Sequence, residues 1–257
     1  MKFCKRLLHV KTNTCTASVY GELGRYPLYI NRYVRIIKYW LKLVKTNNIL
    51  LRVVYLQALA DSNNGYSNWV TNVRKLLSDF GFAYVFDTVH NVSVILNAFV
   101  HEFKCRIIDT FKQEWYGSLC NSSVLDMYKI FKNTFQYEDY LNMLPRKYRY
   151  YLCRLRMSVH PLRIQTGRYA RNNIQRNERY CICCNQLDIE DEFHFVCICP
   201  CYIVIRQKYI KRHYYVRPSV FKFHELLNSV NRCELIKLCN YVKESLCIRN
   251  AILNSAT

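Results

Sequence analysis

The feature that most constrains this chain is a group of three cysteines and one histidine in the run CICCNQLDIEDEFHFVCIC. Cys181, Cys184, His194 and Cys199 follow the spacing C-x2-C-x9-H-x4-C. Three thiolates and one imidazole make the ligand set of a closed, four-coordinate structural zinc site. Such a site leaves no position for water or substrate. The motif therefore predicts a small module folded around Zn2+ and argues against metal-assisted hydrolysis.

Other cysteines leave the ligand set open. The chain contains 14 Cys, and Cys183, Cys197 and Cys201 crowd the same segment, where they could replace one of the four ligands. A cluster of inert or redox-active thiols is the alternative to a metal site. The metal is favoured because the segment has too few apolar residues to form a core of its own. These residues are Phe193, Phe195, Val196 and Ile198.

Length and composition set the class of protein. The 257 residues suit one large or two small domains, and with 51% hydrophobic residues the chain can bury a sizeable core. The apolar piece at the N-terminus is too short for a secretory leader, and the longest apolar stretch, 92–100, is far shorter than the roughly 18 residues of a membrane span. We therefore expect an intracellular protein of the nucleus or cytoplasm, without membrane contact, whose cysteines are thiols and metal ligands rather than disulfides.

The charge of this basic protein is large and unevenly placed. The net charge is +20, from 38 basic and 18 acidic residues. Residues 141–180 carry ten Arg or Lys and one acid, and residues 201–224 carry six basic residues and none. The acids gather between the two stretches, at Asp188, Glu190, Asp191 and Glu192. This pattern predicts two basic stretches that flank a zinc module with an acidic tip.

The basic stretches predict binding to the backbone of RNA, DNA or both, because a polyanion is the natural partner of such a charge. The residues predicted to contact phosphates are Arg156, Arg163, Arg168, Arg171, Arg176, Arg179, Arg206, Lys208, Lys211 and Arg212. Tyr169, Tyr202 and Tyr209 are expected to stack on exposed bases. The alternative is a zinc-stabilised protein-interaction module with no nucleic-acid role, whose acidic tip meets a basic partner.

The periodicity of apolar residues predicts a mainly α fold: a helical array followed by a small β-hairpin zinc knuckle and C-terminal helices. Residues 1–26 are expected to be irregular or partly strand-like. The predicted helices cover 27–45, 48–60, 67–80 with Ser67 as cap, 93–115 with Ser93 as cap, a segment from Ser122 or Ser123, parts of 137–158, 200–213, 218–230 and 232–248. Short strands are expected at 180–182 and 193–196. The predicted domains are 1–160, a basic linker with the CCHC module over 161–217, and 218–257.

Several catalytic signatures are missing from the sequence. There is no Asp-Asp pair of the polymerase type. A metal-dependent nuclease would need spaced Asp residues after the zinc motif, but no Asp follows Asp191. Neither a phosphate-binding Gly-x4-Gly-Lys loop nor a Gly-x-Ser-x-Gly nucleophile elbow is present. The sequence therefore predicts a binding protein and not an enzyme.

Beyond the zinc motif, a wider pattern resembles a known family. It consists of Leu155-Arg156, Arg168-Tyr169-Ala170-Arg171, Cys181-x2-Cys184, Glu192-x-His194, Cys199-Pro200 and the stretch 19–40. Together they resemble the zinc-binding region that follows the polymerase core in non-LTR retrotransposon reverse transcriptases. The resemblance is strongest over 155–217 and assigns the ligand roles to Cys181, Cys184, His194 and Cys199.

The resemblance implies a reverse transcriptase-like protein without its active site. In that family the polymerase carboxylates lie upstream, and the region after the thumb helps to grip template RNA and target DNA. Residues 1–160 would then be thumb-like. The expected protein is a nucleic-acid-binding C-terminal fragment, with upstream polymerase domains as possible partners in a longer polyprotein.

Overall fold

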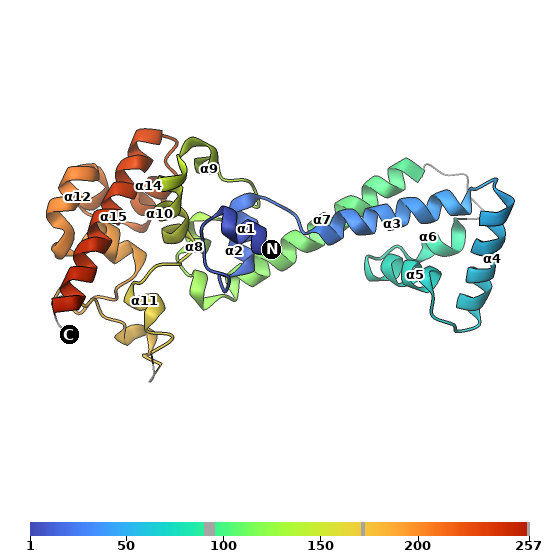
Figure 1. Cartoon of the computed structure of the whole chain (residues 1–257), viewed down its shortest axis with the longest axis horizontal. Helices are drawn as coiled ribbons and strands as arrows, with labels where there is room; N and C mark the ends of the chain where they lie inside the picture. The colour runs from blue at the N-terminus through green and yellow to red at the C-terminus, as the bar shows by residue number, and fades with distance from the viewer. Residues whose placement is uncertain (90–95, 171–172, 256–257) are drawn as a thin grey trace. The chain divides into compact units, whose positions relative to one another are not determined.

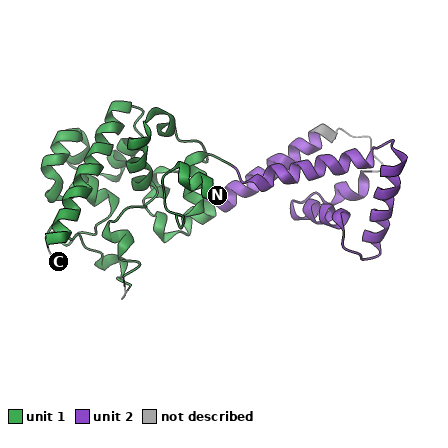
Figure 2. Cartoon of the chain, in the orientation of Figure 1, with its two compact units in different colours: residues 1–25, 116–257 green, residues 26–115 purple. Residues whose placement is uncertain are grey.

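The computed structural model describes residues 1–89, 96–170 and 173–255. The fold is mainly helical, as predicted (Figure 1). It forms two compact units, the first made of residues 1–25 and 116–257 and the second of residues 26–115 (Figure 2). The divisions predicted at residues 160 and 217 both fall inside the first unit. Ser93, the predicted cap of one helix, and Arg171 lie outside the described residues.

Unit 1 is assembled from both ends of the chain. Its helices are α1 (Lys2–Leu7), α2 (Thr16–Leu23), η1 (Ser123–Leu125), α8 (Tyr128–Phe131), α9 (Tyr140–Met143), α10 (Arg146–Arg156), α11 (Arg163–Thr166), η2 (Arg176–Glu178), η3 (His194–Ile198), η4 (Pro200–Tyr202), α12 (Ile203–Tyr209), α13 (Arg212–Tyr215), α14 (Val220–Leu227) and α15 (Arg232–Ser255). Unit 2 contains α3 (Leu28–Val44), α4 (Ile49–Asn63), α5 (Trp69–Asp79), α6 (Ala83–Thr88) and most of α7 (Leu96–Cys120).

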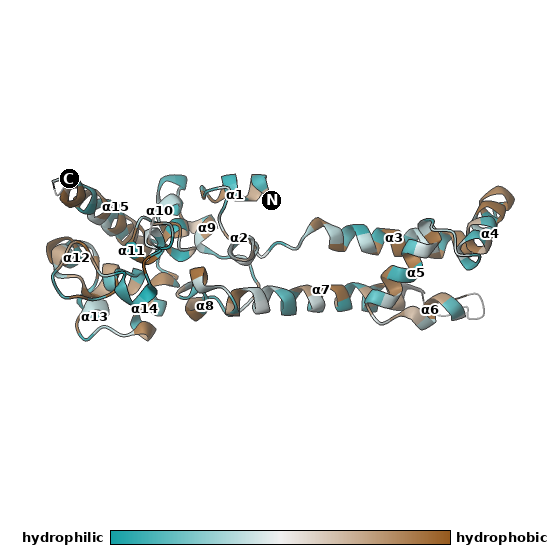
Figure 3. Cartoon of the chain, turned by 90° about the horizontal axis from the view of Figure 1, so that it is seen from below, coloured by the Kyte–Doolittle hydropathy of each residue, from teal (hydrophilic) through white to brown (hydrophobic). Residues whose placement is uncertain are grey.

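Unit 2 follows the predicted helical pattern closely. Along α3 hydrophobic and hydrophilic residues alternate (Figure 3), and the apolar face is buried through Val34 and Ile37. Trp40 of this helix stacks on Phe86 with ring centroids 5.5 Å apart. The predicted cap Ser67 is wrong by one residue. Asn68 accepts hydrogen bonds from the first turn of α5 in a capping box.

The N-terminal segment differs from its prediction, because residues 1–26 form two helices. The second helix is held by tertiary contacts, which periodicity over so short a segment does not reveal. Its Glu22 is fully enclosed, and the backbone N–H of Glu138 donates to the Glu22 carbonyl at 3.0 Å. Gly24 ends α2 with φ +52°, and a Cβ there would lie 2.2 Å from the backbone nitrogen of Tyr137.

In unit 1 the long helix α15 is the element against which α10 and α12 pack (Figure 1). Leu152 and Leu155 of α10 are buried, as are Leu238 and Val242 of α15. The exposed faces of α10 and α15 carry Arg, Lys and Tyr side chains. Packing of these two helices thus buries their apolar residues and leaves Arg146, Lys147 and Lys243 exposed.

A buried guanidinium joins distant segments of unit 1. Arg156 lies 3.1 Å from Glu22 and 2.6 Å from Glu138, and it donates to the Leu227 carbonyl at 3.1 Å and to the Asn228 side chain at 2.8 Å. Burial alone would lower the pKa of Arg156, but the carboxylates of Glu22 and Glu138 raise it above its usual value. The cation is therefore permanent and fully paired inside the protein.

The predicted β-hairpin is not present in the described residues. Tyr180 and Ile189 form one isolated antiparallel bridge, and the predicted strand 193–196 is instead part of the π-helical turn η3. Within the described part of the chain, no helix is both long and apolar enough to cross a membrane.

Replacing Arg156 tests how far unit 1 depends on the buried ion pairs. Arg156→Met should lower the free energy of unfolding by about 3–5 kcal/mol, because it leaves the Glu22 carboxylate buried without a partner. Urea unfolding followed by circular dichroism measures the loss. The matched control Arg212→Met removes an exposed arginine and should leave stability nearly unchanged. Equal stability of the two variants would contradict the assigned role.

Candidate metal centre

The first two ligands lie on a tight loop closed by backbone hydrogen bonds. The Cys181 N–H donates to the Asp188 carbonyl at 2.8 Å, and the Glu190 N–H donates to the Arg179 carbonyl at 2.9 Å. These bonds flank the isolated bridge and bring residues 181–188 back on themselves. Leu187 adopts φ +55° within the turn. The loop presents the sulfurs of Cys181 and Cys184 to the same point.

The other two ligands lie at the ends of one helical turn. Asp191 caps it, because its carboxylate accepts from the His194 N–H at 2.7 Å. The Cys199 N–H donates to the His194 carbonyl at 2.8 Å, a bond that spans five residues and defines the wide π turn. This turn brings the His194 and Cys199 side chains to the same face. That requirement explains why the predicted strand is not formed.

Two of the distances between the four candidate ligand atoms match those of a tetrahedral metal site, and the others are short enough for one shared ion. The Cys181 and Cys199 sulfurs lie 3.9 Å apart, and the Cys184 sulfur lies 3.4 Å from His194 Nε2. All four atoms lie within 4.8 Å of one another. A tetrahedron with bonds of about 2.3 Å to sulfur and about 2.0 Å to nitrogen puts two sulfurs about 3.8 Å apart and a sulfur about 3.5 Å from the nitrogen. The cluster can therefore hold a metal ion.

Burial and hydrogen bonds shift the pKa values of two candidate ligands, Cys181 and His194. Cys181, His194 and Cys199 are buried, and Cys184 is half-buried at the edge of the cluster. Burial lowers the pKa of His194, which favours the neutral imidazole that a metal site needs. A hydrogen bond with Cys183 lowers the pKa of Cys181, but its hydrogen bond with Cys199 and burial raise it to about 12. Metal binding must displace the thiol proton.

The competing cysteines fit less well. Cys183 shares a second group of donor atoms with Cys181 and Glu190, but this group has only three members. The Glu190 carboxylate is already paired with Arg249 at 2.6 and 2.8 Å. Cys201 is exposed, and its sulfur contacts the Cys183 carbonyl. Among the described residues, the predicted set of four is the most complete ligand set.

Arg206 holds the metal-bearing turn in place and is not a surface residue. Its guanidinium is buried and donates to the carbonyl of Val196 at 2.7 Å and to that of Cys199 at 2.8 Å. These are terminal carbonyls of η3, which need donors once the turn ends. Tyr241 of α15 donates to the Phe195 carbonyl at 2.5 Å. The metal cluster is thus fastened to α12 and α15.

The predicted acidic tip is largely folded inward. Glu190 pairs with Arg249, and Asp191 caps η3, so neither carboxylate is a free surface charge. Glu192 is buried and accepts from Ser158 and His160, each at 2.7 Å. Burial alone would raise the pKa of Glu192, but His160 and Ser158 lower it below its usual range. Of the four acids, only Asp188 is exposed.

Three of the ten residues predicted to contact phosphates are buried and bonded. Arg156 forms the ion pairs of unit 1, and Arg206 caps η3. Arg179 donates to the carbonyls of Ile174 and Ile164, each at 2.9 Å. Their side chains do not reach the surface, so we assign them to the fold and correct the prediction for these positions.

Most of the remaining predicted residues lie at or near the surface. Arg163 and Arg168 are half-buried, and Arg168 donates to Ser123. Four residues are exposed: Arg176, Lys208, Lys211 and Arg212. Arg176 is paired with Asp126, Lys208 lies 3.3 Å from Glu244, and Lys211 lies 2.9 Å from Glu234. Lys208 lies on α12, Lys211 directly precedes α13, and Arg212 is the first residue of α13.

The tyrosines predicted to stack on bases differ in the same way. Tyr169 is 77% exposed, and its ring is free to meet a base. Tyr202 is buried against Phe195 with ring centroids 5.1 Å apart, so it belongs to the core. Tyr209 is half-buried and donates its hydroxyl to Glu244. The sequence analysis did not identify Arg249 and Tyr241. Their only sequence signal is a polar side chain among the apolar positions of a long helix.

Comparison of the chain with protein-family models, curated proteins and solved structures finds no match.

The ligand set can be tested by metal analysis of single variants. We expect one metal ion per chain, lost in Cys181→Ser, Cys184→Ser, His194→Ala and Cys199→Ser, because each removes one of four donors. Cys183→Ser and Cys201→Ser are matched controls in the same segment and should keep the metal. Elemental analysis of purified protein gives the answer. Loss of metal in Cys183→Ser but not in Cys184→Ser would assign the site to the second group of donors.

Proposed function

We propose that this chain is a zinc-stabilised nucleic-acid-binding protein without catalytic activity of its own. The observation that carries the proposal is the gathering of three sulfurs and one imidazole, all within 4.8 Å of one another, in a largely buried cluster. The net charge of +20 supports a polyanionic partner. The resemblance of residues 155–217 supports a C-terminal fragment of a non-LTR retrotransposon reverse transcriptase that lacks the polymerase active site.

Zinc is the metal that this ligand set suits best. Thiolates with one imidazole in a tetrahedron select zinc over the oxygen-seeking cations. All four positions are filled by protein atoms, so the ion is structural and supplies no bound water for catalysis. In the folded module it would hold the loop 181–188 against η3.

The zinc module supports binding by placing charged residues that follow it in sequence. Arg206 links the carbonyls of η3 to α12, and the exposed Lys208 lies two residues further along the same helix. Lys211 and Arg212 begin the next turn of basic surface. Loss of the metal would therefore loosen the scaffold behind these charges. Their role is to neutralise phosphates, which gives affinity without base preference.

The protein-interaction alternative loses its main support. It relied on an acidic tip that would meet a basic partner, but Glu190, Asp191 and Glu192 are bonded within the module. The surviving exposed acid, Asp188, lies 3.5 Å from His194 Nδ1, where it suits an outer partner of a metal-bound imidazole.

Salt dependence tests the proposed function. Binding to unrelated RNA and DNA oligonucleotides should weaken as salt rises, with a slope of about −0.9 per phosphate contact for duplex and about −0.7 for single strands. The variant Lys208→Ala/Lys211→Ala/Arg212→Ala should lose up to about three phosphate contacts. The slope of log K against log salt should become shallower by the same number of contacts for every sequence. The charge-conserving triple Lys208→Arg/Lys211→Arg/Arg212→Lys is its control. Salt-independent binding, or none in 50 mM salt, would exclude nucleic acid as the partner.

Absence of catalysis is a separate expectation. Pure protein should neither extend a primer nor cleave nucleic acid with divalent metal, because the sequence has no Asp-Asp pair and no Asp beyond Asp191. The test uses protein at substoichiometric amounts with Mg2+ or Mn2+. Turnover that stays with the protein through purification, and that controls do not trace to a contaminant, would refute the proposal.

A further inference from the structure

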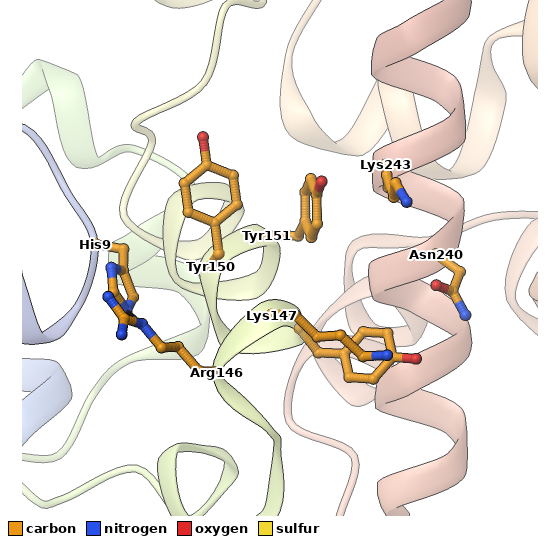
Figure 4. Close-up of a pocket in the computed structure, with 8 residues that line it drawn as sticks. His9, Arg146, Lys147, Tyr150, Tyr151, Asn240 and Lys243 are labelled. Carbon is orange, nitrogen blue, oxygen red and sulfur yellow. Dashed lines mark hydrogen bonds between the residues drawn. The ribbon is translucent and has the colours of Figure 1, made fainter.

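A groove in unit 1 is lined by none of the candidate metal ligands and by none of the residues predicted from the sequence to contact phosphates. It has a volume of about 580 Å³ and is bordered by α10 on one side and α15 on the other (Figure 4). Its basic residues are Arg146, Lys147 and Lys243, and its aromatic residues are Tyr148, Tyr150 and Tyr151. Of the described residues that line it, none carries a carboxylate.

Arg146, Lys147 and Lys243 form no salt bridge among the described residues. Arg146 and Lys147 are exposed on the first turn of α10, and Lys243 is exposed on α15. Arg146 donates to His9 Nε2 at 2.9 Å. Burial together with Arg146 lowers the pKa of His9, which favours the neutral ring that accepts this hydrogen bond. Glu244, next to Lys243, forms its hydrogen bonds with Tyr209 and Lys208, and Lys243 acts on it only through its nearby charge.

The tyrosines form a surface for flat, polarisable groups. All three are half-buried, so each ring keeps part of its surface in solvent. Tyr150 and Tyr151 meet edge to face with centroids 5.0 Å apart, which fixes both rings. Lys147 lies over the ring of Tyr148 at 4.7 Å, so a cation and a ring already share one site.

The groove continues into a second cavity of about 300 Å³. The two share Tyr150, Tyr151 and Lys243. The second cavity extends to Leu155 and to Phe195 of the metal-bearing turn. Arg154 and His160 also line this second cavity, so basic and apolar groups lie on both sides of the tyrosine pair, along the contact between α10 and α15.

We infer that this groove binds single-stranded nucleic acid, with phosphates on Arg146, Lys147 and Lys243 and bases against the tyrosine rings. Alternating cations and aromatic faces are the features by which proteins hold single strands without reading sequence. A duplex keeps its base faces stacked inside and cannot use the rings. The inference rests on the proposed function for the choice of nucleic acid as the polyanion. It assigns the nucleic acid to a site separate from the basic residues that follow the zinc motif.

The test separates the rings from the charges in the full-length, metal-loaded chain. Fluorescence anisotropy measures binding of labelled single-stranded oligo(U) and oligo(dT), and of a mixed-sequence duplex of equal length. Tyr150→Leu/Tyr151→Leu should weaken both single strands at least fivefold, since each stacked base contributes about 1–3 kcal/mol, and should leave duplex binding and the salt slope unchanged. Tyr150→Phe/Tyr151→Phe keeps the rings and should bind within about twofold of wild type.

The charges are tested by Arg146→Gln/Lys243→Gln, which should reduce the single-strand salt slope by about 1.4, at about 0.7 per lost contact. Circular dichroism and metal content of each variant confirm that it is folded. If wild type binds but the leucine variant binds single strands equally well, the inference fails and the proposed function stands. If wild type binds no nucleic acid, both fail. Displacement of oligo(U) by poly-glutamate at equal charge concentration would also overturn the inference, because it would make the groove a general anion site.

Discussion

The buried Arg156 guanidinium is the interaction on which unit 1 depends. It brings Glu22, Glu138 and Asn228 together although Glu22 and Arg156 are 134 residues apart in sequence. Four segments must be in place before the cation is fully paired, and an incomplete set would leave a buried charge at high cost. The network thus couples α2, the turn before α9 and the end of α14 to α10. Because α10 also forms one side of the groove, the ion pairs fix the position of its surface residues as well.

Buried side chains also support the candidate metal centre from segments outside it. Arg206 and Tyr241 bond the carbonyls of η3, and Arg249 pairs with Glu190 behind the ligand loop. The ligand geometry is therefore supported by three side chains that touch no ligand sulfur. α15 contributes to the candidate metal centre and to the groove, since its inner face carries Tyr241 and Arg249 and its outer face carries Lys243. A change in η3 would reach the neighbourhood of the groove through Phe195, which lines the adjoining cavity.

The parts of the structure that could be predicted are those specified by local pattern. The 3.6-residue spacing of apolar residues predicts α3, and the spacing of cysteines and histidine predicts the metal cluster. The hairpin was wrong because alternation in FHFV is also compatible with a helical turn, and the Asp191 cap decides for the turn. Helix α2 was missed because long-range pairing of Glu22 stabilises it, and nothing within residues 1–26 reports that partner.

The distribution of arginine matters more than its number. A count over residues 141–180 treats Arg146, Arg156 and Arg179 alike, yet only the first is exposed. Two of these guanidinium groups satisfy carboxylates and carbonyls inside the fold, so they add to net charge without adding surface for a phosphate. Exposed charge instead gathers where helices leave it no acidic partner, as at Arg146 and Lys243. For a basic helical protein, then, the charges that remain unpaired after folding are a better guide to a polyanion site than the richest stretch of sequence.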